Sequence, residues 1–495
     1  MTPMVRSSIA RSSLWNLAGF GVPIVAALIA VPFVVRGLGV ERFGILALAW
    51  AIMGAAAMLD LGFGRALTQI VAKRRAIHET AELNSLVMTA TAFLGGVAIA
   101  AAAVLAAAAS WLVTDVFRVD PMFTAEAREA IALLAVGLPF VICGGALQGV
   151  LEGHLRFDLS NLVRIPLSAL NYLVPLAILP FSTDLAWIVG GTVLARVFGF
   201  LAYAALARHV MGAGGWPAGI RPQLLRPVLA LGGWMAVSTV VAALIIYLDR
   251  FAIGALLTMS ALAFYVTPFE IVSRLAIIPG AVGGALLPAF ASVTPAAPQQ
   301  IDDYFGRGLR YVVLLVFPAA MIVVLFAHEG LALWIGDDFA AASTRIAQIL
   351  AVGLFANSLA MIPLIFLYGL GRADVAAKIH LLELPAYAIV LWLLVPIFGA
   401  EGAALAWTLR ALVDAVLLFA ISRRVYPTKE VRYARITAAM LMGIGTLSIG
   451  CLMAGPGRVA YGVFILGIFA VYGWRRLLTT HERLALAKAM SRKHE

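Results

Sequence analysis

Leu151–Asp158 reads Leu-Glu-Gly-His-Leu-Arg-Phe-Asp, and Leu367–Asp374, at an offset of 216, reads Leu-Tyr-Gly-Leu-Gly-Arg-Ala-Asp. Leucine, glycine, arginine and aspartate recur at the same four places. The segments Trp15–Ala72 and Trp234–Ala291 agree with this spacing. Each opens on tryptophan, runs through two long apolar stretches and closes on alanine, with an offset of 219. Two nearly equal offsets predict that the chain consists of two homologous halves.

The apolar content decides which class of protein contains this repeat. Of the 495 residues, 63% are hydrophobic and 12% are charged. A soluble protein of this length could not bury so much apolar surface in one core. We therefore expect an all-α integral membrane protein. Cys143 and Cys451 lie within apolar runs, which predicts no disulfide framework, no metal site and no cofactor.

About fourteen apolar runs are long enough to cross the hydrocarbon, which takes roughly 20 residues each. The runs of the first half are 13–36, 43–68, 84–112, 128–151, 161–181, 185–207 and 225–248. The runs of the second half are 257–290, 309–328, 343–370, 379–398, 403–422, 434–454 and 457–475. The eighth run contains Pro268 and Pro279, which predict a kink or a tilt.

The basic residues predict the orientation in the membrane. Most of the 36 lysines and arginines fall into segments on one side when both termini are placed in the cytoplasm. The first apolar run is too long for a cleavable signal peptide and is expected to be an uncleaved span. The net charge of +11 is then explained by topology and by anionic lipid at the inner face. It does not indicate binding to nucleic acid.

Several segments resemble the polysaccharide and O-antigen flippases of the multidrug/oligosaccharidyl-lipid/polysaccharide exporter superfamily. They are Trp15-Asn16, Val35–Ile45, Asp60–Leu67, Tyr247–Phe251, Phe264-Tyr265 and Gly369–Arg372. Each motif is short, so the specificity comes from their order and from the full-length topology. One departure is Leu46, where members often have an aromatic residue.

The resemblance implies two six-helix lobes that face each other in a V around a central cavity. The N-terminal lobe would span 1–210 (helices 1–6) and the C-terminal lobe 211–425 (helices 7–12). Residues 426–495 would hold helices 13–14 and a basic cytoplasmic tail. The implied cargo is an undecaprenyl-pyrophosphate-linked glycan, flipped across the bacterial inner membrane by alternating access. Membrane lipids and the glycan polymerase and chain-length machinery are the other implied partners.

Charges inside spans are costly and must face the interior, so they are the candidates for the site. Glu270 and Arg274 lie four residues apart on one helix face. Subtracting the repeat offset of 219 places them on Ala51 and Ala55, so the fold does not require charges at this level. We predict that Arg274 meets an anionic head group and that Glu270 holds it or couples a proton. A structural ion pair between the lobes is the alternative.

Three further residues are candidates for the cavity. Asp60 and Arg65 lie near the cytoplasmic end of helix 2, where Arg65 could meet the pyrophosphate or simply follow the orientation rule. Asn16 could bind a sugar or a neighbouring helix. No nucleotide-binding motif occurs, which predicts coupling to a proton or sodium gradient.

The remaining intramembrane charges suggest ion pairs. Arg410 and Asp414 repeat the four-residue spacing, and Arg196 lies at a similar depth in the other half, which favours pairs within each lobe. Asp249 and Arg250 are expected at the outer end of helix 7, as a gate pair or in a hydrated turn, and Arg36 has the same two interpretations.

Two further sets of charged residues are expected toward the cytoplasmic side of the membrane. Glu383 is expected to be satisfied by Lys378 or by water. The repeated pairs Arg156/Asp158 and Arg372/Asp374 predict a charge clamp at two equivalent turns.

Three alternatives remain open at this level. A drug exporter of the same superfamily would need a net acidic cavity, whereas arginines accompany the acids here. A peptidoglycan lipid flippase carries the same pyrophosphate chemistry. A membrane glycan polymerase or ligase would need a substantial outer loop with catalytic groups. The longest such loop, about 113–127, offers Asp115, Arg118, Asp120 and Glu126 but no histidine, so we expect no enzymatic activity.

Overall fold

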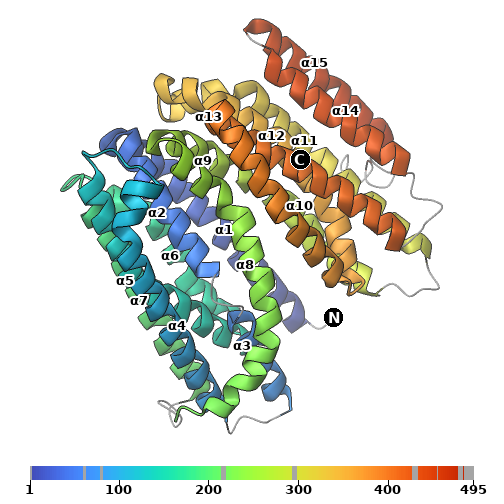
Figure 1. Cartoon of the computed structure of the whole chain (residues 1–495). Helices are drawn as coiled ribbons and strands as arrows, with labels where there is room; N and C mark the ends of the chain where they lie inside the picture. Colours follow the sequence, from blue (N-terminus) through green and yellow to red (C-terminus); the bar gives the residue numbers. More distant parts are fainter. Residues whose placement is uncertain are drawn as a thin grey trace. The chain divides into compact units, whose positions relative to one another are not determined.

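The computed structural model describes residues 3–58, 63–77, 82–212, 219–292, 298–425, 433–453, 455–477 and 483. These residues form long helices and short helical turns, without a β-strand among them (Figure 1). The helices of the first part are α1 (Pro3–Leu38), α2 (Val40–Met58), α3 (Phe63–Ala76), α4 (Leu83–Trp111), α5 (Thr124–Gly153), α6 (Phe157–Ile178), α7 (Leu185–Met211) and α8 (Leu225–Leu256). They are followed by α9 (Met259–Arg274), α10 (Ile277–Ser292), α11 (Pro298–Trp334), α12 (Asp337–Gly369), α13 (Ala373–Val425), α14 (Tyr433–Leu452) and α15 (Pro456–Tyr472).

The predicted membrane class is confirmed. Within the described residues, 12 helices are long and apolar enough to cross a membrane, and a shorter apolar helix spans Met440–Leu452. The helix α13 contains 53 residues and bends at Gly399 (φ 60°), so it covers two of the predicted runs. The expected kink near Pro268 and Pro279 is also present, because α9 ends at Arg274 and α10 begins at Ile277. The chain is a multi-pass membrane protein.

The chain divides into two compact units, 1–263 and 264–495. In the first unit, α5 packs against α2, α3, α4 and α7. In the second, α12 packs against α10, α11, α13 and α14. The helix α8 packs on α2 and α3 and so groups with the first unit. The predicted lobe boundary near residue 210 stays a prediction.

Two helix contacts confirm the internal repeat. A Cβ built on Gly153 would lie 2.8 Å from the Cβ of Val71, and a Cβ built on Gly369 would lie 2.5 Å from the Cβ of Phe290. The two glycines are related by the offset of 216 and their two partners by the offset of 219, which are the offsets found in the sequence. In each half, glycine lets two helices approach within backbone contact at the same place.

The repeated turns also match. Leu155 (φ 60°) and Gly371 (φ 71°) both have left-handed backbone and are related by the same offset of 216. In each turn the next arginine donates its N–H to a leucine carbonyl five residues earlier, at 3.0 Å for Arg156 and 2.8 Å for Arg372. This is the helix-terminating pattern that normally requires glycine at the left-handed position.

The predicted charge pairs are present, each within one turn, and their role in joining the flanking helices stays a prediction. Arg156 donates two hydrogen bonds of 2.9 Å to Asp158, which raise the pKa of the Arg156 guanidinium. Asp374 lies 3.4 Å from Arg372 and 3.5 Å from Lys378.

Candidate functional site

A cavity of ≈ 160 Å³ lies inside the first unit. Residues of α5, α6 and α7, together with Ala57 of α2, form its wall, and two of them are arginines: Arg164 of α6 and Arg196 of α7. Aromatic and small residues provide the rest of the lining: Phe140, Phe200, Tyr203, Gly144 and Gly145. A pocket in a helical bundle with a few convergent polar groups is a common place for a ligand.

Both arginines bind neutral amide oxygens. The Arg164 guanidinium donates to the side-chain oxygen of Asn161 at 2.5 Å, and that of Arg196 donates to the side-chain oxygen of Asn171 at 2.8 Å. Within the described part of the chain, neither arginine forms an ion pair with a carboxylate. Two uncompensated positive charges therefore line a cavity in a membrane-spanning bundle, an arrangement that favours an anionic ligand.

Glu152 lies one helical turn after Gln148, which lines the cavity. The carboxylate of Glu152 accepts hydrogen bonds from Gln148 at 2.9 Å and from Ser160 at 3.0 Å. Gln148 also accepts a 3.4 Å hydrogen bond from the Tyr203 hydroxyl, which lines the same cavity. These hydrogen bonds hold Gln148 and Glu152 in place, and none of them pairs a carboxylate with Arg164 or Arg196.

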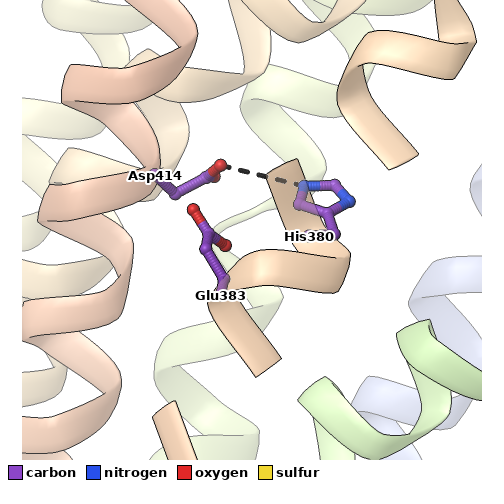
Figure 2. Close-up of side chains that lie close together, drawn as sticks. All are labelled: His380, Glu383 and Asp414. Carbon is purple, nitrogen blue, oxygen red and sulfur yellow. Dashed lines mark ion pairs between the residues drawn. The ribbon is translucent and has the colours of Figure 1, made fainter. Parts of the chain in front are cut away.

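The second unit contains a different polar centre, formed entirely by α13. His380 and Glu383 lie before the bend at Gly399, and Arg410 and Asp414 lie after it. Figure 2 shows the carboxylates of Glu383 and Asp414 pointing toward each other, with His380 beside them. His380 Nε2 is 3.8 Å from Asp414 Oδ1, and Arg410 lies 3.6 Å from Glu383 Oε2.

These two centres occupy related positions in the repeat. The offset of 216 relates Arg164 to His380, and it relates Leu167, which also lines the first cavity, to Glu383. The first half therefore has a cation and an apolar residue where the second half has a histidine and an acid.

The side chains that contact Arg196 and Arg410 are also related by the repeat. Arg196 binds Asn171, while the Arg410 guanidinium lies 5.7 Å from the ring centre of Tyr387. The same offset of 216 relates Asn171 to Tyr387. One fold thus supports a cationic, open centre in one half and a buried centre of mixed charge in the other.

Charges of the second centre pair within one half, as predicted, but with other partners than the local ones expected. Arg410 faces Glu383 rather than Asp414, although the two predicted partners are four residues apart on one helix. Lys378 pairs with Asp374 and not with Glu383. The bend at Gly399 folds α13 back on itself, so partners distant in sequence replace the local ones.

Glu270 and Arg274 do pair as predicted, at 3.0 Å within α9. Their side chains remain 38% and 34% exposed, so both can still reach a ligand. Their predicted contact with cargo stays a prediction.

Four further candidates, Arg65, Asp60, Asn16 and Arg36, have separate outcomes. Arg65 donates a 2.6 Å hydrogen bond to Thr239 of α8. Asp60 and the side chain of Asn16 lie outside the described residues. Arg36 is exposed near the end of α1.

The structure corrects one of the two expectations for Asp249 and Arg250. Both are buried inside α8, which continues to Leu256, so the hydrated-turn interpretation is wrong. Arg250 donates to the Ile246 carbonyl at 2.6 Å and lies 3.3 Å from Asp249. It also stands 5.2 Å from the ring centre of Tyr247.

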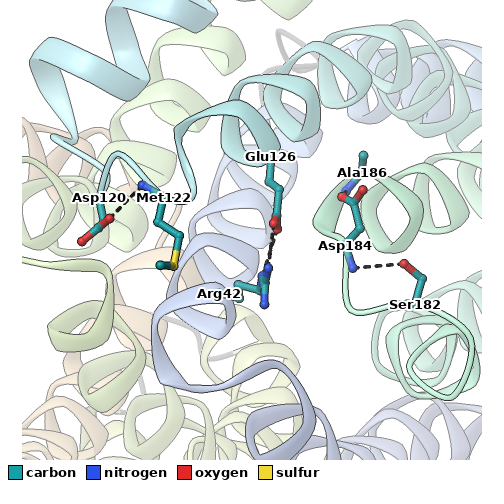
Figure 3. Close-up of polar contacts among 7 residues, drawn as sticks. All are labelled: Arg42, Asp120, Met122, Glu126, Ser182, Asp184 and Ala186. Carbon is teal, nitrogen blue, oxygen red and sulfur yellow. Dashed lines mark hydrogen bonds and ion pairs between the residues drawn. The ribbon is translucent and has the colours of Figure 1, made fainter.

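The acids of the 113–127 segment have structural partners (Figure 3). Glu126 accepts hydrogen bonds of 3.0 and 2.7 Å from Arg42, which joins α2 to α5. Asp120 accepts the Met122 N–H at 2.9 Å, and Asp115 accepts the Thr114 hydroxyl at 2.6 Å. These contacts order a turn and join two helices.

Residues 33–344 match the family described as Polysaccharide biosynthesis protein. The chain is 29% identical over 411 residues to the putative O-antigen transporter of Shigella flexneri, an alignment that covers 83% of this chain and 97% of that relative.

Two solved structures show the same fold. One is the lipid II flippase MurJ in an inward closed conformation, with a TM-score of 0.72 and 11% identity, covering 94% of this chain and 100% of that chain. The other is an inward-facing multidrug resistance MATE family transporter of the MOP superfamily. Its TM-score is 0.68 and its identity 16%, covering 86% of this chain and 95% of that chain.

Proposed function

The chain belongs to the polysaccharide biosynthesis protein family, and from this premise we propose that it is a flippase for lipid-linked glycans. It moves a polyprenyl-pyrophosphate-linked oligosaccharide from the cytoplasmic to the periplasmic leaflet of a bacterial inner membrane. Undecaprenyl pyrophosphate is the proposed carrier, and the glycan polymerase is a proposed downstream partner. Both termini are proposed to be cytoplasmic.

The observation that carries this proposal is the pair Arg164 and Arg196 on the cavity of the first unit. A pyrophosphate loses its hydration when it leaves water, so a protein must replace that hydration with positive charge and hydrogen-bond donors. Arginine forms paired hydrogen bonds to phosphate oxygens through its planar guanidinium. Each amide that now holds an arginine is neutral, so the arginine can exchange it for phosphate without leaving a bare carboxylate.

The cavity is small relative to a complete glycan. Typical ligand sites have volumes of about 300–1,000 Å³, whereas this cavity measures ≈ 160 Å³. It therefore suits the pyrophosphate group, while the sugars and the polyprenyl tail lie outside it. Glu270 and Arg274 are proposed as a second contact with the head group during alternating access.

The two arginines of the cavity also help to distinguish the alternative functions. A cationic drug would be repelled by two uncompensated arginines. A peptidoglycan lipid would meet the same chemistry, and the relative from Shigella flexneri favours a surface polysaccharide. The outer acids are used in structural contacts, which gives no support to a polymerase or ligase.

The test is a reconstituted flipping assay with a fluorescent polyprenyl-pyrophosphate-linked N-acetylglucosamine as the probe. A membrane-impermeant reductant reports the fraction of probe in the outer leaflet of the vesicle. Wild type should equilibrate the probe between leaflets, and Arg164→Ala and Arg196→Ala should slow this by roughly tenfold or more, the loss expected for a charged phosphate contact.

The matched control is Arg208→Ala, which removes an exposed arginine from the end of the same helix as Arg196. It should leave flipping unchanged. Equal rates for all four proteins, or a wild type that exports cationic dyes but not the probe, would overturn the proposal.

A further inference from the structure

The α13 centre contains an excess of buried negative charge. The side chains of Glu383 and Asp414 are 4% and 7% exposed, and Arg410, at 10%, is the permanently charged cation paired with them among the described residues. Both oxygens of Glu383 and Oδ1 of Asp414 are buried without a hydrogen-bonding partner in the same part of the chain. With a neutral His380, two ionised carboxylates and one arginine would leave an uncompensated buried charge, which is strongly unfavourable. One proton, held by a carboxylate or by His380, removes this charge.

The fold does not require these acids. The residue that the repeat places opposite Glu383 is Leu167, and the first half carries no acid where α13 has Asp414. Arg196 in the first half is satisfied by an uncharged amide. A buried charge that the architecture can do without, and that remains partly unsatisfied, is a candidate for binding a small cation.

We propose that Glu383, Asp414 and His380 form a binding site for one exchangeable proton, whose uptake and release couples this flippase to the pH gradient. This inference rests on the proposed function for its role in transport, but the proton site itself can be tested without cargo. The proton occupies the contact between the two carboxylates, and His380 receives it from or passes it to Asp414.

The geometry favours a proton over a metal ion. The ligand atoms of His380, Glu383 and Asp414 lie within 4.8 Å of one another, so an ion could be reached by all three. However, Arg410 lies 3.6 Å from Glu383 Oε2 and would repel a second cation there. Sodium and calcium also prefer several oxygen ligands, and calcium takes about 6–8 of them, whereas this centre offers two carboxylates and an imidazole.

Charged and titratable groups near the site lie on α13 and on the helices that contact it. On α13 they are His380, Tyr387 and Arg410 around the two acids. The helix α9 contacts α13 through Phe269 and Trp407, and its Glu270 and Arg274 pair with each other at 3.0 Å. The helix α11 contacts α13 through Phe305 and Phe419 and contributes the cations Arg307 and Arg310. On α12, which packs along α13, the ionisable groups Asp337, Asp338 and Arg345 lie toward the end remote from the connecting turn. At 1.5 Å per residue, Arg345 is displaced by roughly 20 Å along the bundle from the level of Glu383.

The bend at Gly399 explains how binding of the proton could change the arrangement of the two segments of α13. His380 and Glu383 belong to the segment before the bend, and Arg410 and Asp414 to the segment after it. With the proton bound, the two acids attract; without it, they repel at close range in a low dielectric. The proton therefore changes the force between two packed segments of one helix.

The first experiment detects the proton directly. Difference infrared spectroscopy of the purified protein in nanodiscs, between alkaline and mildly acidic pH, should show the carbonyl band of a buried protonated carboxylic acid. Glu383→Gln and Asp414→Asn should remove or shift this band. Glu401→Gln, which changes another α13 carboxylate outside the centre, should leave it in place. A band unchanged in both centre variants would overturn the proton site.

The second experiment tests coupling in proteoliposomes, with the fluorescent pyrophosphate-linked probe. For one coupled proton, a gradient of one pH unit should change the ratio of probe between leaflets by about tenfold. Glu383→Gln should abolish this response while still exchanging probe between leaflets at equal pH. His380→Gln should slow the response to the gradient.

The outcomes separate the two proposals. Wild type that exchanges probe but ignores a pH gradient, or that follows a sodium gradient instead, would overturn the coupling inference alone. Wild type that exchanges no probe under any gradient would overturn the proposed function, and the infrared band would still decide whether the site binds a proton.

Discussion

Glu41 accepts hydrogen bonds from both the hydroxyl and the backbone N–H of Ser260, the latter at 3.1 Å, and the two residues are 219 positions apart. That number is the repeat offset, so the start of α2 contacts the start of α9, its counterpart in the second half. Ser260 lies in the first turn of α9, where backbone N–H groups have no partner within the helix. Glu41 thus caps another helix with a negative charge at its positive end.

Replacing Glu41 by alanine should lower stability, because the first turn of α9 loses its charged acceptor. A hydrogen bond to a charged group contributes about 1.5–3 kcal/mol. The measurement is thermal unfolding in detergent, comparing Glu41→Ala with Glu41→Gln, which keeps the shape and an acceptor oxygen. Glu41→Gln should lose less than Glu41→Ala. Identical unfolding temperatures for all three proteins would contradict the capping role.

Replacing Leu155 by glycine should raise stability. Leu155 is 71% exposed and has a left-handed backbone, while its repeat counterpart is already glycine, Gly371. A left-handed conformation costs a residue with a Cβ about 1–2 kcal/mol, part of which is offset by the extra freedom of glycine when unfolded.

The reverse change, Gly371→Leu, should destabilise by a similar amount. Chemical denaturation of both variants in the same detergent measures the two changes. A loss of stability in Leu155→Gly would show that the turn is not strained.

Replacing Gly153 by alanine should destabilise the α3–α5 contact. The added Cβ would lie 2.8 Å from Val71 and 2.9 Å from the carbonyl oxygen of Thr68, and backbone cannot yield as a side chain can. Overpacking of this kind costs about 1–3 kcal/mol. Gly96→Ala is the matched control, since that glycine also lies in a helix but meets nothing within 4 Å. Retention of the wild-type unfolding temperature by Gly153→Ala would be incompatible with the contact.

The stability of the turn after α5 should depend on His154. Burial lowers the pKa of His154 below the ordinary value of 6.5, and Arg75 adds to this effect, while the hydrogen bond to Val150 opposes it. The folded protein therefore binds fewer protons than the unfolded chain as the pH falls below about 6.5. Stability should be complete above that value and should fall as the pH approaches the lowered pKa.

Thermal unfolding across this pH range should show a shallower decline for His154→Gln than for wild type. The Nδ1 atom of His154 lies 2.9 Å from the Val150 carbonyl, and glutamine can replace that donor. Parallel pH profiles would mean that His154 does not titrate on unfolding.

Sequence reasoning was reliable where it used repetition and composition. The repeat in Leu151–Asp158 and Leu367–Asp374 predicted equivalent turns, and both turns have the same backbone and the same charge pair. The break between α9 and α10 also followed from local chemistry, because Pro279 has no N–H to donate to the carbonyl of Leu275, four residues earlier. Local rules of this kind need no knowledge of which helices are neighbours.

The sequence reasoning missed the site geometry. The sequence patterns do not single out Arg164, yet it lines the cavity with Arg196. The repeat offered a signal, since the offset of 216 places the polar His380 opposite Arg164.

The sequence by itself determined that this protein is a two-fold repeated bundle of membrane-spanning helices, because apolar length and periodic similarity are properties of the chain alone. Only the tertiary structure decided which charges meet. Helices in a membrane protein are apolar on most faces, so hydrophobic patterning does not reveal which face is turned inward. The pairing of Arg410 with Glu383, and the burial of Asp249, depend on how helices fold back and pack, which residue spacing does not encode.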